Sequence, residues 1–280
     1  MKPSPTAPKR PALRYYGGKW RLAPWIISHF PEHQNYVEPC GGAASVLLQK
    51  PRSPLETYND LDGNVVNFFL VLRDQPDELI RKIRLTPWAR AEYELSLEPC
   101  EDVVERARRF WCTLQMSINA SSGQVAPGFR RVTQDAPKLP ELYCRSKILD
   151  GLMETAARLD GVQIELQPAA DIILTFDHLD TLTYFDPPYL PETRAQADRY
   201  LLEVDQAFHI QCAALLRQAA GYVVVSGYAC PLYTDLYEAH GWTRVDKEAQ
   251  TNSGGKRIES LWLSPRTVDA LGVHEQLDFF

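Results

Sequence analysis

Short apolar runs of strand length alternate with helical patterns in two separate parts of the chain. The first part, residues 35–59, reads as a strand, a glycine turn, a helix over 43–48 and a second strand. The second part adds strands at 181–185 and 222–226 around a helical stretch at 206–220. Because helices between strands form crossover connections, this alternation predicts an α/β fold with one mostly parallel sheet. The expected fold class is a Rossmann-like sheet that takes strands from both parts.

The stretch between the two parts carries helical patterns rather than strand-like ones. Apolar residues recur at helical spacing over 103–118, and a charged amphipathic pattern occupies 76–97. The segment 119–139 is rich in Ser, Gly and Pro, which is typical of loops. The sequence therefore predicts one domain formed by residues 1–74 and 161–265 and a mainly helical insertion at 75–160.

The last strand-like runs lie at residues 242–248 and 260–263, on either side of the loop 251–256. Two strands joined by a short Gly-containing loop favour a hairpin, so we expect an antiparallel pair at the edge of the sheet. Residues 266–280 are expected to form a peripheral tail.

Composition limits the classes of protein and of site. The formal net charge is −6, so a nucleic-acid partner must be argued from local residues and not from the overall charge. No apolar run reaches the roughly 20 residues that cross a bilayer, and we expect a cytoplasmic protein with no membrane partner. The six cysteines form no CxxC pair and the histidines show no ligand spacing, so no metal site is predicted.

Two strand ends in the first part carry residues suited to a nucleotide-like ligand. Glu38-Pro39-Cys40-Gly41-Gly42 follows the first strand, where open α/β sheets bind ligands and where glycines allow a close approach of the backbone. Asp60 follows the second strand, where an acidic residue can accept hydrogen bonds from a ribose diol. Alternatively, the glycines form only a tight connection and Asp60 only caps a helix.

The segment Asp186-Pro187-Pro188-Tyr189 directly follows the apolar strand at 181–185. Two successive prolines remove backbone donors and hold the chain extended, so that carbonyl groups point out of the sheet. The segment therefore indicates a rigid site that accepts hydrogen bonds. A proline turn with Tyr189 as a core aromatic is the alternative.

Six segments, in their order along the chain, resemble the Dam-type DNA adenine methyltransferases, in the subgroup whose Asp-Pro-Pro-Tyr motif follows the target-recognition region. Besides that motif, the similar segments are Arg14–Lys19, Tyr36–Gly42, Asn59–Asp62, Ser226–Tyr228 and Glu259–Trp262. The resemblance runs from about residue 13 to residue 265. It implies an enzyme that transfers a methyl group from S-adenosylmethionine to N6 of adenine in duplex DNA, and an insertion that recognises the target.

The resemblance also implies which residues bind the cofactor. Tyr15, Lys19, Asp60 and Asp186 are expected to contact S-adenosylmethionine, with Lys19 near its carboxylate. Glu38, Pro39, Gly41 and Gly42 are expected to shape the pocket. The chain departs from its relatives at Pro168, near which they commonly carry an acidic residue that contacts the cofactor's adenine. Either Gln167 or a backbone group takes that place, or the affinity for the cofactor is reduced.

The catalytic residues predicted from this segment are Asp186, Pro187, Pro188 and Tyr189. The Asp186 carboxylate and the Pro187 carbonyl can each accept one amino hydrogen of adenine, which directs the nitrogen lone pair toward the methyl group. Tyr189 is expected to stack on the adenine. These contacts require a base outside the duplex.

The insertion also contains the candidate DNA contacts, which can bind phosphates or read base edges. They are Asn119, Ser121, Arg130, Arg131, Lys138, Arg145 and Lys147. A solvated basic face is the alternative for each basic residue.

Two other functions remain open at this point. One is methyl transfer to another amino group, of cytosine, RNA or protein, and the other is a non-catalytic DNA-binding relative. We expect a monomer or weak dimer, and the family leaves room for a restriction endonuclease partner.

Overall fold

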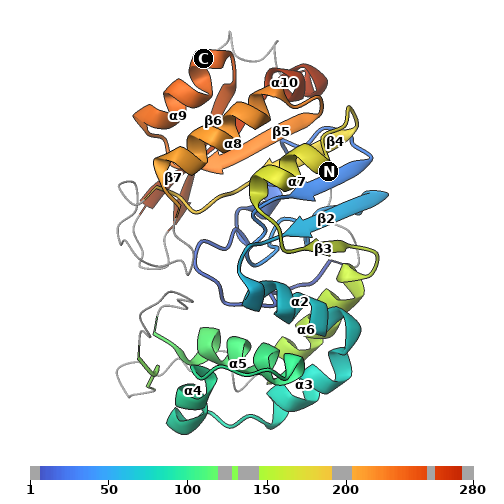
Figure 1. Cartoon of the computed structure of the whole chain (residues 1–280), viewed down its shortest axis with the longest axis vertical. Coiled ribbons are helices and arrows are strands. Elements are labelled where there is room, and N and C mark those ends of the chain that lie inside the picture. Colours follow the sequence, from blue (N-terminus) through green and yellow to red (C-terminus); the bar gives the residue numbers. More distant parts are fainter. Residues whose placement is uncertain (1–6, 119–127, 132–144, 191–203, 251–255, 273–280) are drawn as a thin grey trace.

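The computed structural model describes residues 7–118, 128–131, 145–190, 204–250 and 256–272. Among these residues, seven strands form one sheet in the order β3-β2-β1-β4-β5-β7-β6 (Figure 1). The strands are β1 (Asn35–Glu38), β2 (Leu55–Asn59), β3 (Gln163–Glu165), β4 (Thr181–Phe185), β5 (Tyr222–Gly227), β6 (Thr243–Gln250) and β7 (Lys256–Leu263).

The pairing of the strands confirms the predicted fold class. Strands β1 to β5 pair in parallel, and β7 runs antiparallel to both β5 and β6. The hairpin is longer than its sequence pattern indicated, because β7 begins at Lys256 and pairs with β6 along its whole length. The order of parallel strands reverses between β1 and β4, and such a reversal opens a crevice at the carboxyl ends of the strands.

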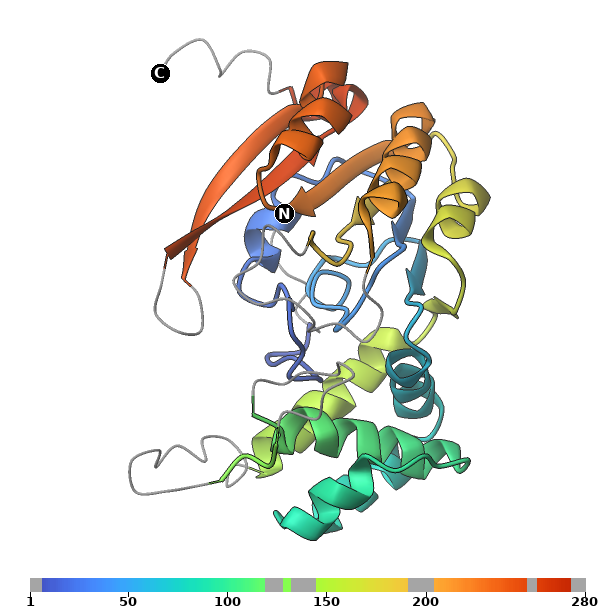
Figure 2. The same cartoon turned by 60° about the vertical axis from the view of Figure 1, so that its left-hand side comes forward.

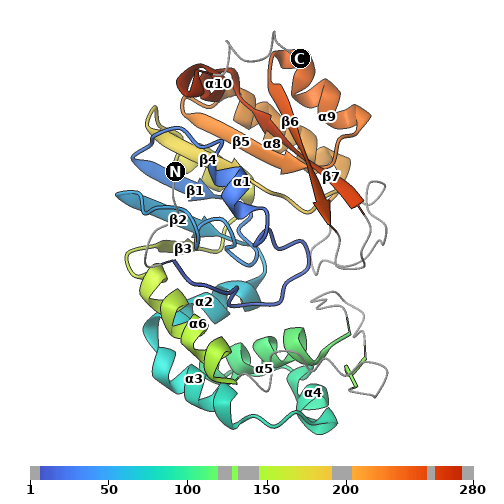
Figure 3. The same cartoon turned by 180° about the vertical axis from the view of Figure 1, so that it is seen from behind.

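Helices cover both faces of the sheet. The helices α7 (Ala169–Thr175), α8 (Gln206–Gln218) and α9 (Pro231–Leu236) lie on the face seen in Figure 1, while α1 (Ala23–Ile27) lies on the face seen in Figure 3. The short 3-10 helix η2 (Glu238–His240) follows α9. No sequence pattern had predicted α1, α7 or α9, each of which is at most seven residues long.

Helices of the insertion form a layer of their own beyond β3 (Figures 1 and 2). The helix α2 (Gly63–Asp74) leads from β2 into this layer, and its Asp62 cap accepts a hydrogen bond from the Asn64 amide. The layer continues with α3 (Pro76–Leu85), α4 (Arg90–Ser96), α5 (Val103–Met116) and α6 (Arg145–Leu159). Both α5 and α6 pack against α2, which follows β2 directly, so α2 is one of the connections between the layer and the sheet.

One predicted helix is wrong. Residues 43–48 form a series of turns rather than a helix, although their apolar side chains are buried. Gly42 and Ala44 have positive φ angles of 47° and 53°, and a right-handed helix cannot continue through that conformation.

The chain after β7 is anchored to the sheet. Of the expected peripheral tail, residues 266–272 are described, and all but the last belong to α10 (Pro265–Leu271). Thr267 and Val268 are buried, and the Thr267 hydroxyl donates to the Val223 carbonyl in β5. These residues extend the core instead of lying outside it.

Candidate functional site

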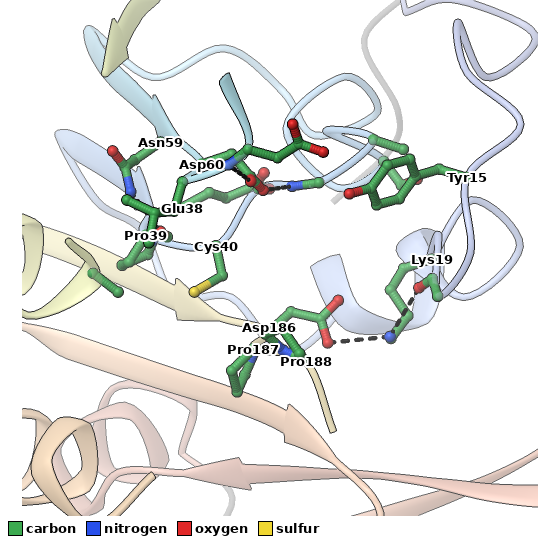
Figure 4. Close-up of a pocket in the computed structure, with 18 of the residues that line it drawn as sticks. Tyr15, Lys19, Glu38, Pro39, Cys40, Asn59, Asp60, Asp186, Pro187 and Pro188 are labelled. Atoms are coloured by element: carbon green, nitrogen blue, oxygen red, sulfur yellow. Dashed lines mark hydrogen bonds and ion pairs between the residues drawn. The ribbon is translucent and has the colours of Figure 1, made fainter. Parts of the chain in front are cut away.

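A pocket lies at the carboxyl ends of β1, β2 and β4, where the strand order reverses (Figure 4). It is lined by every residue that the sequence placed at the cofactor, namely Tyr15, Lys19, Glu38, Pro39, Gly41, Gly42, Asp60 and Asp186. Pro187 and Pro188 also line it. Residues separated by up to 193 positions, from Tyr15 to Phe208, thus meet in one cavity.

Glu38, the last residue of β1, is only 2% exposed. Its Oε1 accepts hydrogen bonds from the Tyr36 hydroxyl at 2.6 Å and from the Leu47 amide at 2.8 Å. Burial raises the pKa of Glu38 to about 8, although these two hydrogen bonds oppose the shift. The pocket therefore contains a carboxyl group that can be neutral near physiological pH.

Asp60 follows β2 and fixes the loop that begins the pocket. Its Oδ2 accepts a hydrogen bond from the Gly42 amide at 2.7 Å, and its Oδ1 accepts one from the Asp62 amide at 2.8 Å. Burial raises the pKa of Asp60 to about 6, while the hydrogen bonds from the backbone lower it. The carboxylate thus holds the ends of β1 and β2 together, and carboxylate oxygens can accept more than one hydrogen bond.

The side chains of Lys19 and Asp186 point toward each other and form an ion pair in the pocket (Figure 4). Lys19 Nζ lies 3.1 Å from Asp186 Oδ1 and also donates to the Gly17 carbonyl. Both side chains are largely buried, at 7% and 16% exposure. Because the pair is shielded from water, its positive and its negative group can each interact strongly with a charged ligand in the pocket.

Tyr189 does not line the pocket. Its hydroxyl hydrogen-bonds to Ser226 at 2.9 Å and to Glu259 at 3.1 Å, and the residue is only 6% exposed. Lys19 Nζ lies over the ring, 4.5 Å from its centre, and Tyr228 packs against it edge-on. Stacking of this ring on a base therefore remains a prediction that requires Lys19 to leave the ring face.

Two pocket residues, Asn59 and Cys40, lie within the sequence motifs but had no role assigned to them. Asn59 donates to the Pro39 and Gln167 carbonyls and accepts from the Gln167 amide, so that it fastens the end of β3 to the end of β1. Gln167 lines the pocket beside Pro168, as expected. The sulfur of Cys40 points toward Pro187 (Figure 4). The position of Asn59 directly before Asp60 was the available signal for its role.

Only part of the predicted DNA-binding set lies in the described residues. Arg130 and Arg131 follow Gly128, and the Arg130 amide donates to the Met116 carbonyl at the end of α5. Arg145 and Lys147 lie on α6 with side chains that are not described. Asn119, Ser121 and Lys138 lie outside the described residues.

Arg14 is a candidate that the sequence reasoning missed. Its guanidinium donates to the Ser117 carbonyl at 3.1 Å, directly after the end of α5. Burial, and next the neighbouring charge of Arg130, lower the pKa of Arg14. Two guanidinium groups thus lie close together where the amino-terminal segment meets the insertion.

Comparison with known proteins confirms the family resemblance. The model of the D12 class N6 adenine-specific DNA methyltransferase family matches residues 15–252. The type II methyltransferase M1.LlaDCHI of Lactococcus lactis subsp. cremoris is 26% identical over 281 residues, which cover 90% of this chain and 94% of that protein.

Two further relatives have similar names. The DNA adenine methylase of Vibrio cholerae is 27% identical over 194 residues, 65% of this chain and 66% of that protein. The type II methyltransferase M.MjaIII of Methanocaldococcus jannaschii is 22% identical over 289 residues, 90% of this chain and 96% of that protein. With a family match that spans the pocket, the chain belongs to the D12 class N6 adenine-specific DNA methyltransferases.

Proposed function

We propose that S-adenosylmethionine, the methyl donor that the family implies, binds in this pocket and that Asp186 and Pro187 hold the acceptor adenine beside it. The observation that carries the proposal is the meeting of Glu38, Asp60 and Asp186 in one cavity at the switch point of the sheet. The bound cofactor would supply a methyl group on a positively charged sulfur.

The charges of the pocket suit such a ligand. Asp60 can accept hydrogen bonds from a ribose diol, and Lys19 can pair with a carboxylate. Asp186 provides negative charge for a cationic sulfur. Gln167, which lines the pocket, can contact an adenine ring.

Asp186 and Pro187 perform the central task in the proposed mechanism. The lone pair of an adenine amino group is delocalised into the ring, so the nitrogen is a poor nucleophile. When the Asp186 carboxylate and the Pro187 carbonyl each accept one amino hydrogen, they favour a tetrahedral nitrogen and direct its lone pair toward the methyl group. Pro187 and Pro188 keep both acceptors rigid, because their rings restrict the backbone.

We assign target recognition to the helical layer and to Arg130 and Arg131. The adenine must leave the base stack, since neither its lone pair nor its ring face is accessible in duplex DNA. Phosphate contacts from basic residues would position the duplex without reading its sequence. Their location between the amino-terminal segment and the insertion supports this assignment.

The cellular setting is also part of the proposal. Two relatives are named type II methyltransferases, which supports the pairing of this chain with a restriction endonuclease. We further propose a monomer or weak dimer in the cytoplasm, where the substrate DNA lies. No helix in the part of the chain that the structure describes could cross a membrane.

Asp186→Ala tests the proposed mechanism directly. We expect it to abolish methyl transfer to DNA while circular dichroism shows an unchanged fold. Asp180→Ala is the matched control, because Asp180 is an exposed acid just before the opposite end of the same strand. Full activity of Asp186→Ala would refute the mechanism.

Digestion of methylated DNA identifies the acceptor. N6-methyladenine is the expected product. Methylcytosine, or label found only in RNA or protein, would instead assign the pocket to another amino group. Calorimetry with S-adenosylmethionine tests the donor, and absence of binding by the folded protein would refute the assignment of the pocket.

A further inference from the structure

A buried ionic cluster joins the end of the insertion to the sheet. Arg158 lies in the last turn of α6 and is 1% exposed. Its guanidinium donates a hydrogen bond to each carboxylate oxygen of Glu56 in β2, at 2.6 and 2.8 Å. Lys50 Nζ contacts the same carboxylate at 2.7 Å. None of these three side chains lines the pocket.

The cluster reaches Glu38 through the backbone of Leu47. Arg158 Nη2 donates to the Leu47 carbonyl at 2.7 Å. The amide of the same residue donates to Glu38 Oε1 at 2.8 Å. Leu47 is fully buried in the turn-rich segment 43–48, which has no regular helix to hold its amide in place. The position of this amide therefore depends on the group that holds its carbonyl.

A second connection runs through Tyr36. Lys50 Nζ lies over the Tyr36 ring, 4.3 Å from its centre. The hydroxyl of that ring donates to Glu38 Oε1 at 2.6 Å. Both donors that the structure gives to Glu38 Oε1 are thus held by partners of Glu56.

The ionic state of the cluster favours a fixed geometry. Burial opposes the ionisation of Glu56, but the hydrogen bond from Arg158 and the charge of Lys50 lower its pKa below the ordinary value. Burial lowers the pKa of Lys50 to about 8, against the pull of Glu56. Removing one member would leave a buried charge without its partner, which destabilises proteins strongly. The three side chains of Arg158, Glu56 and Lys50 therefore stay charged and paired in one geometry.

We propose that Arg158 is a positioning residue that couples the helical insertion to the cofactor pocket by fixing Glu38 through Leu47 and through the Glu56–Lys50–Tyr36 connection. This inference rests on the proposed occupation of the pocket by S-adenosylmethionine. The coupling free energy between two sites is the same in both directions. A change at the insertion that alters the affinity for the cofactor therefore implies that bound cofactor alters the insertion by the same free energy.

Arg158→Lys tests the coupling with the positive charge retained. One ammonium group cannot reproduce the planar fork that contacts Glu56 and Leu47 together. We expect the affinity for S-adenosylmethionine to fall by about tenfold, a usual size for coupling between sites. The KM for the cofactor should rise while kcat at saturating cofactor is retained, because Arg158 does not touch the reacting groups.

Arg52→Lys is the matched control. Arg52 is exposed and lies in the segment just before β2. It also connects this segment to the end of α6, because it donates to the Ala157 and Asp160 carbonyls at 2.8 and 2.7 Å. Unlike Arg158, it contacts neither Glu56 nor Leu47 in the bonds that the structure gives it. Arg52→Lys should leave the cofactor affinity unchanged. Equal losses in the two variants would show a general loosening of α6 and overturn the proposal.

A double-mutant cycle with Glu38→Ala isolates the route, because alanine has no acceptor for the Leu47 amide or the Tyr36 hydroxyl. If Arg158 acts through Glu38, Arg158→Lys should have little further effect on the affinity of Glu38→Ala. Additive losses, or wild-type affinity in Arg158→Lys, would refute the proposal. Wild-type protein that binds no cofactor would instead refute the proposed function itself.

Hydrogen exchange on the wild-type protein provides a test that does not depend on the folding of a variant. Binding of S-adenosylmethionine should slow the exchange of the Leu47 amide and of the amides in the last turn of α6. The amides in the middle of α5 are the internal reference. Protection of the pocket without protection at the end of α6 would overturn the coupling.

Discussion

Lys19 Nζ lies 3.1 Å from Asp186 Oδ1, although the two residues are 167 positions apart in the chain. In the free protein this contact joins the residue proposed to bind the cofactor's carboxylate to the residue proposed to hold the acceptor base. Both functions therefore involve one buried charge pair. A ligand that binds to Lys19 or to Asp186 is expected to weaken the ion pair between these two residues.

Lys19→Gln is predicted to reduce the affinity for S-adenosylmethionine by about tenfold, because a hydrogen bond to a charged group contributes about 1.5–3 kcal/mol. The fold should persist, since the amide can still bond to the Gly17 carbonyl. Calorimetric titration measures the change. Lys247→Gln on β6 removes a positive charge over the Trp25 ring and should leave the affinity unaltered.

Asp60 is predicted to make cofactor binding sensitive to acid. Its pKa of about 6, raised by burial, means that the carboxylate becomes protonated as the pH falls through 6. A neutral acid is a weaker acceptor for a ribose diol, so the affinity should fall below about pH 6. Asp60→Asn should bind more weakly at neutral pH and lose this component of the pH dependence. An identical pH profile in wild type and variant would contradict the assignment.

Glu38 is predicted to make the folded protein less stable as the pH rises. Its pKa is about 8 in the fold against an ordinary value of 4.5, so the folded protein retains a proton that the unfolded chain releases between these values. The free energy of unfolding should therefore fall across this window by an amount on the order of a few kcal/mol.

Glu38→Gln removes this titration. Compared with wild type, the variant should gain stability as the pH is raised from about 5 to about 8. Urea unfolding at both pH values measures the difference. A difference between wild type and variant that does not change with pH would contradict a raised pKa of Glu38.

Ala44 adopts a backbone conformation that usually favours glycine. It is fully buried and has a φ angle of 53°, which costs an L-residue about 1–2 kcal/mol. Ala44→Gly and Ala43→Gly both remove a buried methyl group, but only the first relieves this strain. The first variant should therefore be more stable by about 1 kcal/mol in thermal unfolding. The opposite order would show that Ala44 is not strained in solution.

Arg130→Ala is predicted to weaken DNA binding on all sequences if the side chain contacts a phosphate. The slope of log affinity against log salt concentration should then decrease by about 1. Arg266→Ala is the control, because Arg266 lies on α10, at the far end of the molecule from the insertion (Figure 1). An effect on one DNA sequence only would identify a base contact instead.

The mostly parallel sheet could be predicted from the alternation of strands and helices, because hydrophobic periodicity is a local property that can be recognised in the sequence itself. The Asp186-Pro187-Pro188-Tyr189 segment and the glycines after β1 identified the family for a related reason, since motifs of this kind are short and contiguous. The sequence could not show that 43–48 forms turns, because a left-handed residue such as Ala44 contradicts its own local preference.

Contacts over long distances were decided only by the tertiary structure. Arg158 lies on α6, but nothing local in the sequence indicates that it is buried against Glu56, 102 positions earlier. Tyr189 was expected to be free to stack, yet its hydroxyl bonds to Ser226 and Glu259 from the neighbouring strands β5 and β7. The sequence by itself thus determined the sheet, the motifs and the chemistry they permit. Which charges meet, and how far burial shifts their pKa values, depended on the packing of distant segments around them, because electrostatic interactions are set by distance and solvent exposure in three dimensions.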